Sequence, residues 1–436
     1  MYNIKAMEGI RVRIAPSPTG FAHIGTAYTA LFNYAFARHN KGTFVIRVED
    51  TDVKRNVKGA EEAIFGGLEW LGLDWDESVV TGGKHGPYRQ SEKLDVYRNK
   101  AKELVKKGWA KKEEGAIRFN GGLYEKKINK WITWKDLIRG EISFHTNQLT
   151  DFVILKSDGY PTYNFAVVID DLDMEVTHVI RGEEHIPNTP RQIALYKVFG
   201  QTHPEFAHHV TLRGADRRKL SKRRDPVDLR IYREQGYLPE ALLNFLCLLG
   251  WSHPQEKEIF SLAEFVKLFD LKRMRKAGPV FDVKKLDWMN GEYIRKTQNS
   301  KLKTQIYDFY DGEYDKEAIE KVLPLVQTRM NKLSEFGTMA NFFFKELKID
   351  KKLFEKDYKM YLKSALEVLE HVKPFNLDAV SKELMRAVKE NKYKTGDFFM
   401  SLRLAIAGSR FTPPINESIV ILGKNEVIKR LKEVLD

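Results

Sequence analysis

The chain has 436 residues, enough for about three domains, so a small module held together by disulfides is excluded. Lys and Arg number 73 against 60 Asp and Glu, and the resulting net charge of +13 favours an acidic partner, such as nucleic-acid phosphates or an anionic membrane surface. The single cysteine, Cys247, excludes an internal disulfide and a cysteine-rich zinc site.

The first elements along the chain have the pattern of an α/β domain. Val12 and Ile14 alternate with arginines as in a strand, and the spacing over residues 24–35 predicts a helix that closes near Gly42. A second strand is predicted over residues 44–48. Strand, glycine turn, helix and strand within about 40 residues predict a βαβ unit and a doubly wound parallel sheet.

The rest of the chain changes character twice. Residues 109–168 have the pattern of short strands and turns and are interpreted as an insertion, after which a strand over 176–180 and a helix over 189–199 resume the α/β pattern. Beyond Tyr293 the pattern is helical throughout. No apolar run approaches the ~18 residues of a membrane span, and residues 1–10 lack a signal-peptide stretch, so we expect a cytoplasmic protein without membrane association.

A Pro- and Gly-rich turn joins the first strand to the first helix. It comprises Ala15, Pro16, Ser17, Pro18, Thr19, Gly20, Phe21, Ala22, His23, Ile24 and Gly25. Free N–H groups at a helix start can hold phosphate, and His23 could donate to a phosphate oxygen. The turn matches neither the dinucleotide fingerprint nor the P-loop. A tight turn with a surface histidine is the alternative.

A basic segment follows some two hundred residues later. Seven of the twelve residues from Arg213 to Arg224 are basic, and such a loop suits phosphate. Lys219 and Lys222 could stabilise a leaving pyrophosphate. A nucleic-acid patch and a solvated run of charge are the alternatives.

A third group of polar residues is predicted on sheet segments. It comprises Arg13, Glu49, Asp50, Tyr163, Arg181, Glu183, Glu184 and His185. A site for a small zwitterion needs a cation for the carboxylate and an anion for the ammonium, and this set offers both. Surface salt bridges are the alternative. A carboxylate dyad or metal site at Asp170, Asp171 and Asp173 is a further alternative, although such pairs more often cap helices.

Together these segments resemble a class I aminoacyl-tRNA synthetase, specifically a bacterial-type glutamyl-tRNA synthetase. The stretch from Arg13 to Gly25 is similar to the HIGH signature in its glutamyl form, and Lys219 to Arg223, reading KLSKR, is similar to the KMSKS signature. Residues 47–52, 179–185 and 188–192 also resemble stretches of the glutamyl enzymes. The resemblance is dense over residues 11–289 and thinner beyond.

The resemblance implies a reaction and a set of roles. ATP and glutamate would form glutamyl-adenylate with Mg²⁺ assisting, and the acyl group would pass to the terminal adenosine of tRNA(Glu), with bound tRNA needed for activation. His23 and Lys222 would be catalytic. Glutamate would be bound by Arg13, Ala15, Ser17, Glu49, Tyr163 and Arg181, and ATP by Pro16, Thr19, Gly20, His23, Gly25, Lys219, Leu220, Ser221 and Lys222.

The resemblance also implies a domain plan. Residues 1–93 and 168–216 would form a Rossmann-type catalytic domain, 94–167 a shortened acceptor-binding insertion, 217–293 a stem-contact region with the KMSKS-like loop, and 294–436 an all-α anticodon-binding region. The insertion is far shorter than is usual in the family, and the single cysteine leaves no protein zinc site there. The family expectation is a monomer.

Arg329 is similar in position to an arginine that reads the third anticodon base in discriminating enzymes, and residues 408–414 and 422–424 resemble an anticodon-binding loop and the helix after it. An enzyme that also charges tRNA(Gln) is the first alternative. A glutaminyl-tRNA synthetase is the second, although such enzymes usually end in β-barrels. A truncated relative that modifies a tRNA base and a noncatalytic RNA-binding module are the remaining ones.

Overall fold

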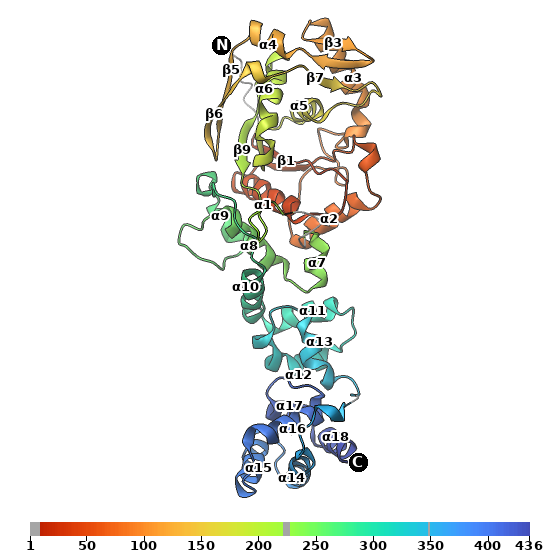
Figure 1. The fold of residues 1–436 in the computed structure, drawn as a ribbon, viewed down its shortest axis with the longest axis vertical. Coiled ribbons are helices and arrows are strands. Elements are labelled where there is room, and N and C mark those ends of the chain that lie inside the picture. Colours follow the sequence, from red (N-terminus) through yellow and green to blue (C-terminus); the bar gives the residue numbers. More distant parts are fainter. Residues whose placement is uncertain (1–8, 221–226, 348) are drawn as a thin grey trace. The chain divides into compact units, whose positions relative to one another are not determined.

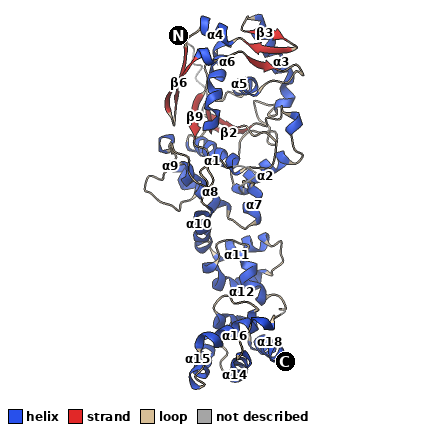
Figure 2. Cartoon of the chain, viewed as in Figure 1, coloured by secondary structure: helices blue, strands red, loops and turns tan. Residues whose placement is uncertain are grey.

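The computed structural model describes residues 9–220, 227–347 and 349–436. The chain divides into two compact units (Figures 1 and 2). The first unit contains Met1–Arg233 and Pro239–Val283, and the second contains Glu234–Leu238 and Lys284–Asp436. No described helix is both long and apolar enough to cross a membrane.

A six-stranded sheet forms the centre of the first unit. Its order is β2 (Thr43–Ile46), β1 (Arg11–Ile14), β8 (His178–Gly182), β9 (Glu205–His209), β5 (Trp131–Asp136) and β6 (Gly140–His145). The strands are parallel except for β6, which forms an antiparallel hairpin with β5. All four residues of β1 are buried, as expected for a parallel strand covered on both faces. The predicted α/β fold is confirmed.

Helices of the first unit cover this sheet or extend from it. They are α1 (Ile24–His39), α2 (Ala60–Leu71), α3 (Leu94–Lys106), α5 (Tyr163–Asp173), α6 (Thr189–Val198), α7 (Leu229–Glu234), α8 (Pro239–Gly250) and α9 (Leu262–Leu268). The helix α10 (Val283–Lys296) follows at the change of unit. Cys247 is buried within α8, where the sequence places it in an apolar run.

The region interpreted as an insertion differs from its prediction in two ways. It holds a separate three-stranded sheet of β3 (Ala110–Glu113), β4 (Ala116–Phe119) and β7 (Phe152–Leu155), but its hairpin β5–β6 extends the main sheet. Residues 121–127, which lie within the predicted run of short strands and turns, form the helix α4 (Gly121–Lys127). Asn120 begins this helix by accepting a 2.8 Å hydrogen bond from the Leu123 N–H.

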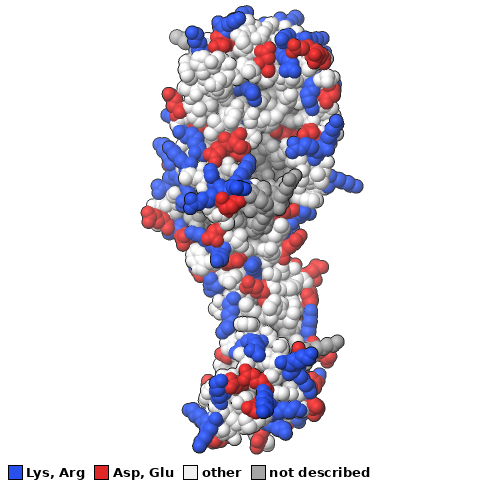
Figure 3. Space-filling view, viewed as in Figure 1, with Lys and Arg blue, Asp and Glu red and all other residues white. Residues whose placement is uncertain are grey.

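The regular elements in the described part of the second unit are all helices, which confirms the predicted all-α region. After α10 it contains α11 (Asn299–Phe309), α12 (Lys316–Val326), α13 (Glu335–Ala340), α14 (Tyr358–His371), α15 (Leu377–Glu390), α16 (Thr395–Ala407), α17 (Ile415–Leu422) and α18 (Lys424–Leu435). Leu362, Leu402 and Leu431, from three of these helices, meet in one buried core. On the face drawn in Figure 3, basic and acidic side chains are interspersed over both units.

Candidate active site

A cavity of about 630 Å³ opens in the first unit where strands β1, β8 and β9 end. Nearly all of the predicted substrate residues line it: Arg13, Ala15, Pro16, Ser17, Thr19, Gly20, His23, Gly25, Glu49, Tyr163, Arg181, Lys219 and Leu220. Ser221 and Lys222 lie outside the described residues. In parallel sheets, the carboxyl ends of the strands are where ligands bind, and the cavity is at this edge.

The turn after β1 leads directly into helix α1. His23 is the N-cap of α1, and its Nδ1 accepts a 2.9 Å hydrogen bond from the Gly25 N–H. Since Nδ1 accepts, the neutral ring carries its proton on Nε2. Gly25 leaves little space, because a Cβ there would lie 3.0 Å from His23 Nδ1. The helix start therefore combines backbone N–H groups with a ring donor, which suits a phosphate.

Two guanidinium groups reach the cavity from neighbouring strands, Arg13 from β1 and Arg181 from β8. Arg13 donates through Nε and Nη2 to both oxygens of Asp171, at 3.0 and 3.1 Å. Arg181 is 5% exposed, and its Nη1 is buried without a hydrogen-bond partner among the described residues. A buried guanidinium donor without a partner is costly, so this group is suited to bind a carboxylate.

Glu49 supplies a carboxylate to the same cavity. It lies three residues beyond the end of β2 rather than on a sheet segment, which corrects the prediction, and its Oε1 accepts from Arg47 Nη2 at 3.0 Å. Burial raises the pKa of Glu49, and the charge of Arg47 opposes that rise. A cationic ammonium ligand would act in the same direction as Arg47 and favour the carboxylate.

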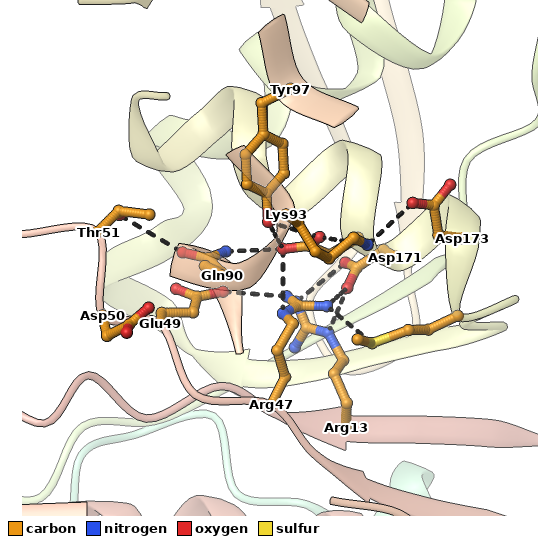
Figure 4. A network of polar contacts seen from close by, with 12 residues as sticks. Arg13, Arg47, Glu49, Asp50, Thr51, Gln90, Lys93, Tyr97, Asp171 and Asp173 are labelled. Atoms are coloured by element: carbon orange, nitrogen blue, oxygen red, sulfur yellow. Dashed lines mark hydrogen bonds and ion pairs between the residues drawn. The ribbon is translucent and has the colours of Figure 1, made fainter. Parts of the chain in front are cut away.

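A buried network holds these groups from behind (Figure 4). Arg47 is fully buried and donates to Asp171 at 2.6 Å, so one carboxylate joins Arg47 to Arg13. Burial works to raise the pKa of Asp171, but Arg13 and Arg47 hold it below its usual value. Asp170 accepts from Lys93 and Tyr97, each at 2.8 Å.

These contacts explain the acidic pair that the sequence left open as a dyad or a metal site. Asp170 and Asp171 are counter-ions of basic side chains, Asp170 of Lys93 and Asp171 of Arg47. No group of three or more His, Cys, Asp or Glu in the described part of the chain is arranged to hold a metal ion.

Tyr163 was expected on a sheet segment, and this expectation is wrong. It is the first residue of α5, and its hydroxyl lies 3.2 Å from Nδ1 of His185. His185 belongs to the short helix η4 (Glu183–Asn188). Burial and the charge of Arg181 lower the pKa of His185 to about 4. The ring is therefore neutral at physiological pH.

Lys219 belongs to the part of the basic segment that the structure describes, which ends at Leu220. Its Nζ lies 2.9 Å from Glu184 Oε1, and both side chains are exposed. An exposed ion pair of this kind is weak and is readily exchanged for a phosphate partner.

In the second unit, Arg403, which no sequence motif indicated, interacts with the predicted loop 408–414 and with the charge of Arg329. Arg403 of α16 donates to the Thr412 carbonyl at 3.0 Å, within the predicted loop 408–414. Burial lowers the pKa of Arg403, and the positive charge of Arg329, in η6 (Gln327–Arg329), lowers it further. Phe411 of the same loop is 85% exposed. Guanidinium groups and an exposed aromatic ring are groups that suit RNA.

Two family models match this chain, one over most of the first unit and one over most of the second. Residues 9–118 and 123–288 match the family model of the class I tRNA synthetase catalytic domain for E and Q, and residues 293–435 match an anticodon binding domain. Glutamate-tRNA ligases of Bacillus cytotoxicus and Bacillus thuringiensis are 40% and 39% identical, with 98% of this chain and 99% of each relative covered.

A solved structure of a glutamate tRNA ligase from Elizabethkingia meningosepticum, in complex with its amino acid, superposes with a TM-score of 0.85 at 32% identity, covering 98% of this chain and 99% of that one. The glutamate-tRNA synthetase of Elizabethkingia anophelis gives a TM-score of 0.82, also at 32% identity, and covers 98% and 100%. The chain therefore belongs to the class I tRNA synthetases and, within that class, to the glutamate-tRNA ligase family.

Proposed function

We infer that this chain is a glutamate-tRNA ligase. It activates glutamate with ATP and transfers the glutamyl group to the terminal adenosine of tRNA(Glu). The observation that carries the proposal is the unpartnered Nη1 of buried Arg181, which shares one cavity with Arg13, Glu49 and the phosphate-suited turn. The full-length similarity to glutamate-tRNA ligases supports the same substrate.

The proposed site binds glutamate through charge. Arg13 and Arg181 bind its carboxylates, and Glu49 binds its ammonium group. Ala15, Ser17 and Tyr163 complete the pocket. In the first step a glutamate carboxylate oxygen attacks the α-phosphorus of ATP, and pyrophosphate leaves. In the second step a terminal adenosine hydroxyl attacks the acyl carbon, and AMP leaves. No protein nucleophile is needed, because positioning and charge neutralisation lower the barrier.

The phosphates of ATP are assigned to the start of α1 and to the basic loop. Backbone groups around Gly20 and Gly25 and the ring of His23 hold the triphosphate, with Pro16, Thr19 and Leu220 beside it. Lys219, Ser221 and Lys222 act on the pyrophosphate side. Mg²⁺ bound with ATP neutralises part of the triphosphate charge. This donor set of N–H groups and cations fits a triphosphate.

The experiment that tests the pocket is Arg181→Ala, assayed by ATP-pyrophosphate exchange with tRNA present. We expect KM for glutamate to rise at least about tenfold, the loss of one charge-assisted interaction, while KM for ATP stays within about twofold. The reverse pattern, with ATP binding lost and glutamate KM unchanged, would reject the assignment.

We propose that Arg329 restricts charging to tRNA(Glu). We also propose that the enzyme acts as a monomer. The charge of Arg329 acts on Arg403, which bonds to the loop that carries the exposed Phe411, and this supports a role in contacting the anticodon. Charging of tRNA(Glu) and tRNA(Gln) by the same enzyme at one salt concentration tests this. Arg329→Gln should gain charging of tRNA(Gln). If the wild-type enzyme charges both tRNAs, Arg329 is not a filter, and the enzyme is the non-discriminating form.

A further inference from the structure

Three buried side chains form a line that leads away from the proposed glutamate pocket. Asp136, His208 and Arg181 are 1%, 0% and 5% exposed. They come from the adjacent strands β5, β9 and β8 of the main sheet. Asp136 ends the first strand of the hairpin that the insertion contributes, and it lies 72 residues before His208 in the sequence.

The hydrogen bonds of this line determine where the protons are. Arg181 Nε lies 3.1 Å from His208 Nε2, and a guanidinium can only donate, so Nε2 must accept. The ring proton is therefore on Nδ1, which donates to Asp136 Oδ2 at 2.5 Å. Thr189 Oγ1 accepts from Arg181 Nη2 at 2.8 Å and lies 3.3 Å from the same Nε2.

The carboxylate of Asp136 is itself held in place. Its Oδ1 accepts from the backbone N–H groups of Ile138, Arg139 and His208 at 3.0, 2.9 and 3.3 Å. Burial works to raise the pKa of Asp136, but the bonds from His208 and the backbone keep it below its usual value. Asp136 is therefore a fixed anion, and its side chain cannot turn away without losing these bonds.

We propose that Asp136 and His208 are positioning residues for the substrate carboxylate. Asp136 fixes the tautomer of His208, whose Nε2 then holds Arg181 Nε and turns the unpartnered Nη1 toward the pocket. The inference rests on the proposed role of Arg181 in binding glutamate. It also means that the inserted hairpin contributes to the glutamate site, because Asp136 belongs to that hairpin.

The contacts of His208 fit only the tautomer with the proton on Nδ1. If the proton moves to Nε2, two donors face each other at 3.1 Å, and Arg181 loses the acceptor that orients it. Asp136→Asn should cause this change, because its amide donates to Nδ1 and so drives the ring proton to Nε2. Packing is retained, since Asn and Asp have nearly the same volume.

Two substitutions of His208 separate its two contacts. His208→Gln places an amide oxygen near the position of Nε2, so Arg181 keeps its acceptor. His208→Asn places an amide near the position of Nδ1, so only the contact with Asp136 remains. We expect Asp136→Asn and His208→Asn to raise KM for glutamate about tenfold, with ATP KM within about twofold, and His208→Gln to restore most of the affinity. Asp158→Asn, at an exposed turn, is the matched control.

Imidazole ¹⁵N NMR of the full-length protein reports the tautomer directly, and the signal absent from His208→Gln identifies His208. The wild type should show the proton on Nδ1 and Asp136→Asn should show it on Nε2, and a rise in glutamate KM in the same variant links substrate affinity to the tautomer. If Asp136→Asn does not fold, the two His208 variants provide the test. The glutamate KM of His208→Asn should then be clearly higher than that of His208→Gln.

Arg181→Lys separates this inference from the function on which it rests. An unchanged glutamate KM in Arg181→Lys would reject the role of Arg181 and this inference with it. A raised KM in Arg181→Lys, together with wild-type glutamate KM in Asp136→Asn and His208→Asn, would reject this inference alone.

Discussion

Asp171 accepts hydrogen bonds from Arg13 and Arg47, so one buried carboxylate fixes two guanidinium groups at the proposed glutamate pocket (Figure 4). Arg47 in turn donates to Glu49, which is assigned to the ammonium group of the substrate. Arg13 and Glu49, which carry opposite charges, are therefore both held through Asp171 and Arg47. Such pre-positioning reduces the cost of ordering the site when the ligand binds.

Asp171→Asn tests this coupling at the residue scale. The amide keeps the shape but removes the charge, leaving two buried cations without their shared anion, so the free energy of unfolding should fall by about 3 kcal/mol. Glutamate KM should rise about tenfold, because Arg13 is no longer held. Chemical denaturation and pyrophosphate exchange measure the two effects. Asp173→Asn, at a more exposed position, is the control, and equal effects in the two variants would contradict the coupling.

Residues that line the cavity could be predicted from sequence, whereas the residues that hold them could not. Arg13, Glu49 and Arg181 stand in recognisable motifs, and all three line the cavity. Asp171 is 158 residues from Arg13, and His208 was singled out by no local pattern. A partner across the sheet is defined by tertiary structure, and a single sequence contains no signal for it.

At the scale of elements, the start of helix α1 combines a helix cap with the proposed ATP site. The Gly25 N–H is bonded to His23 Nδ1, and a Cβ at Gly25 would press against the same atom at 3.0 Å. A side chain at residue 25 would therefore push the ring out of its present position by a few tenths of an ångström. This explains the glycine by close approach, since its φ is not in the left-handed region.

Gly25→Ala should separate helix stability from ligand binding. Alanine favours the helix intrinsically, so the melting temperature should change little, but the displaced His23 should raise KM for ATP about tenfold. Gly66→Ala in α2 is the control, because a Cβ there meets nothing within 4 Å. An unchanged ATP KM in Gly25→Ala would contradict the role given to the His23 ring.

The error in placing Tyr163 on a sheet segment has a physical cause. The helix α5 has seven buried residues, Phe165 to Asp171, in unbroken succession, so it lacks the alternation of polar and apolar faces that marks a surface helix. A continuous apolar run does not by itself distinguish a buried helix from a buried strand. The strands β1 and β8 were predictable, because short β-branched runs next to turns are more distinctive.

At the scale of the whole molecule, buried histidines make stability depend on pH. Burial lowers the pKa of His209 to about 4, so this ring stays neutral in the folded protein while its unfolded counterpart binds a proton below about pH 6.5. The unfolded state then binds more protons than the folded state. Stability is therefore lost as the pH falls below 6.5 and continues to fall until about pH 4.

The expected size of this effect is about 1 kcal/mol from His209 alone between pH 7 and pH 5.5. Denaturant unfolding at the two pH values measures it, and His209→Gln should reduce the difference by that amount. A pH dependence that is the same in wild type and His209→Gln would contradict the assignment.

The central claim is that this cavity selects glutamate, and the most direct measurement is ATP-pyrophosphate exchange by the full-length protein with tRNA present. Glutamate, glutamine and aspartate are compared at equal concentration. Two arginines for carboxylates and one glutamate for an ammonium predict strong exchange with glutamate. Glutamine lacks the second carboxylate, and the carboxylates of aspartate are one methylene closer together than those of glutamate, so we expect weak exchange with each. Comparable exchange with glutamine, or none with glutamate, would contradict the claim.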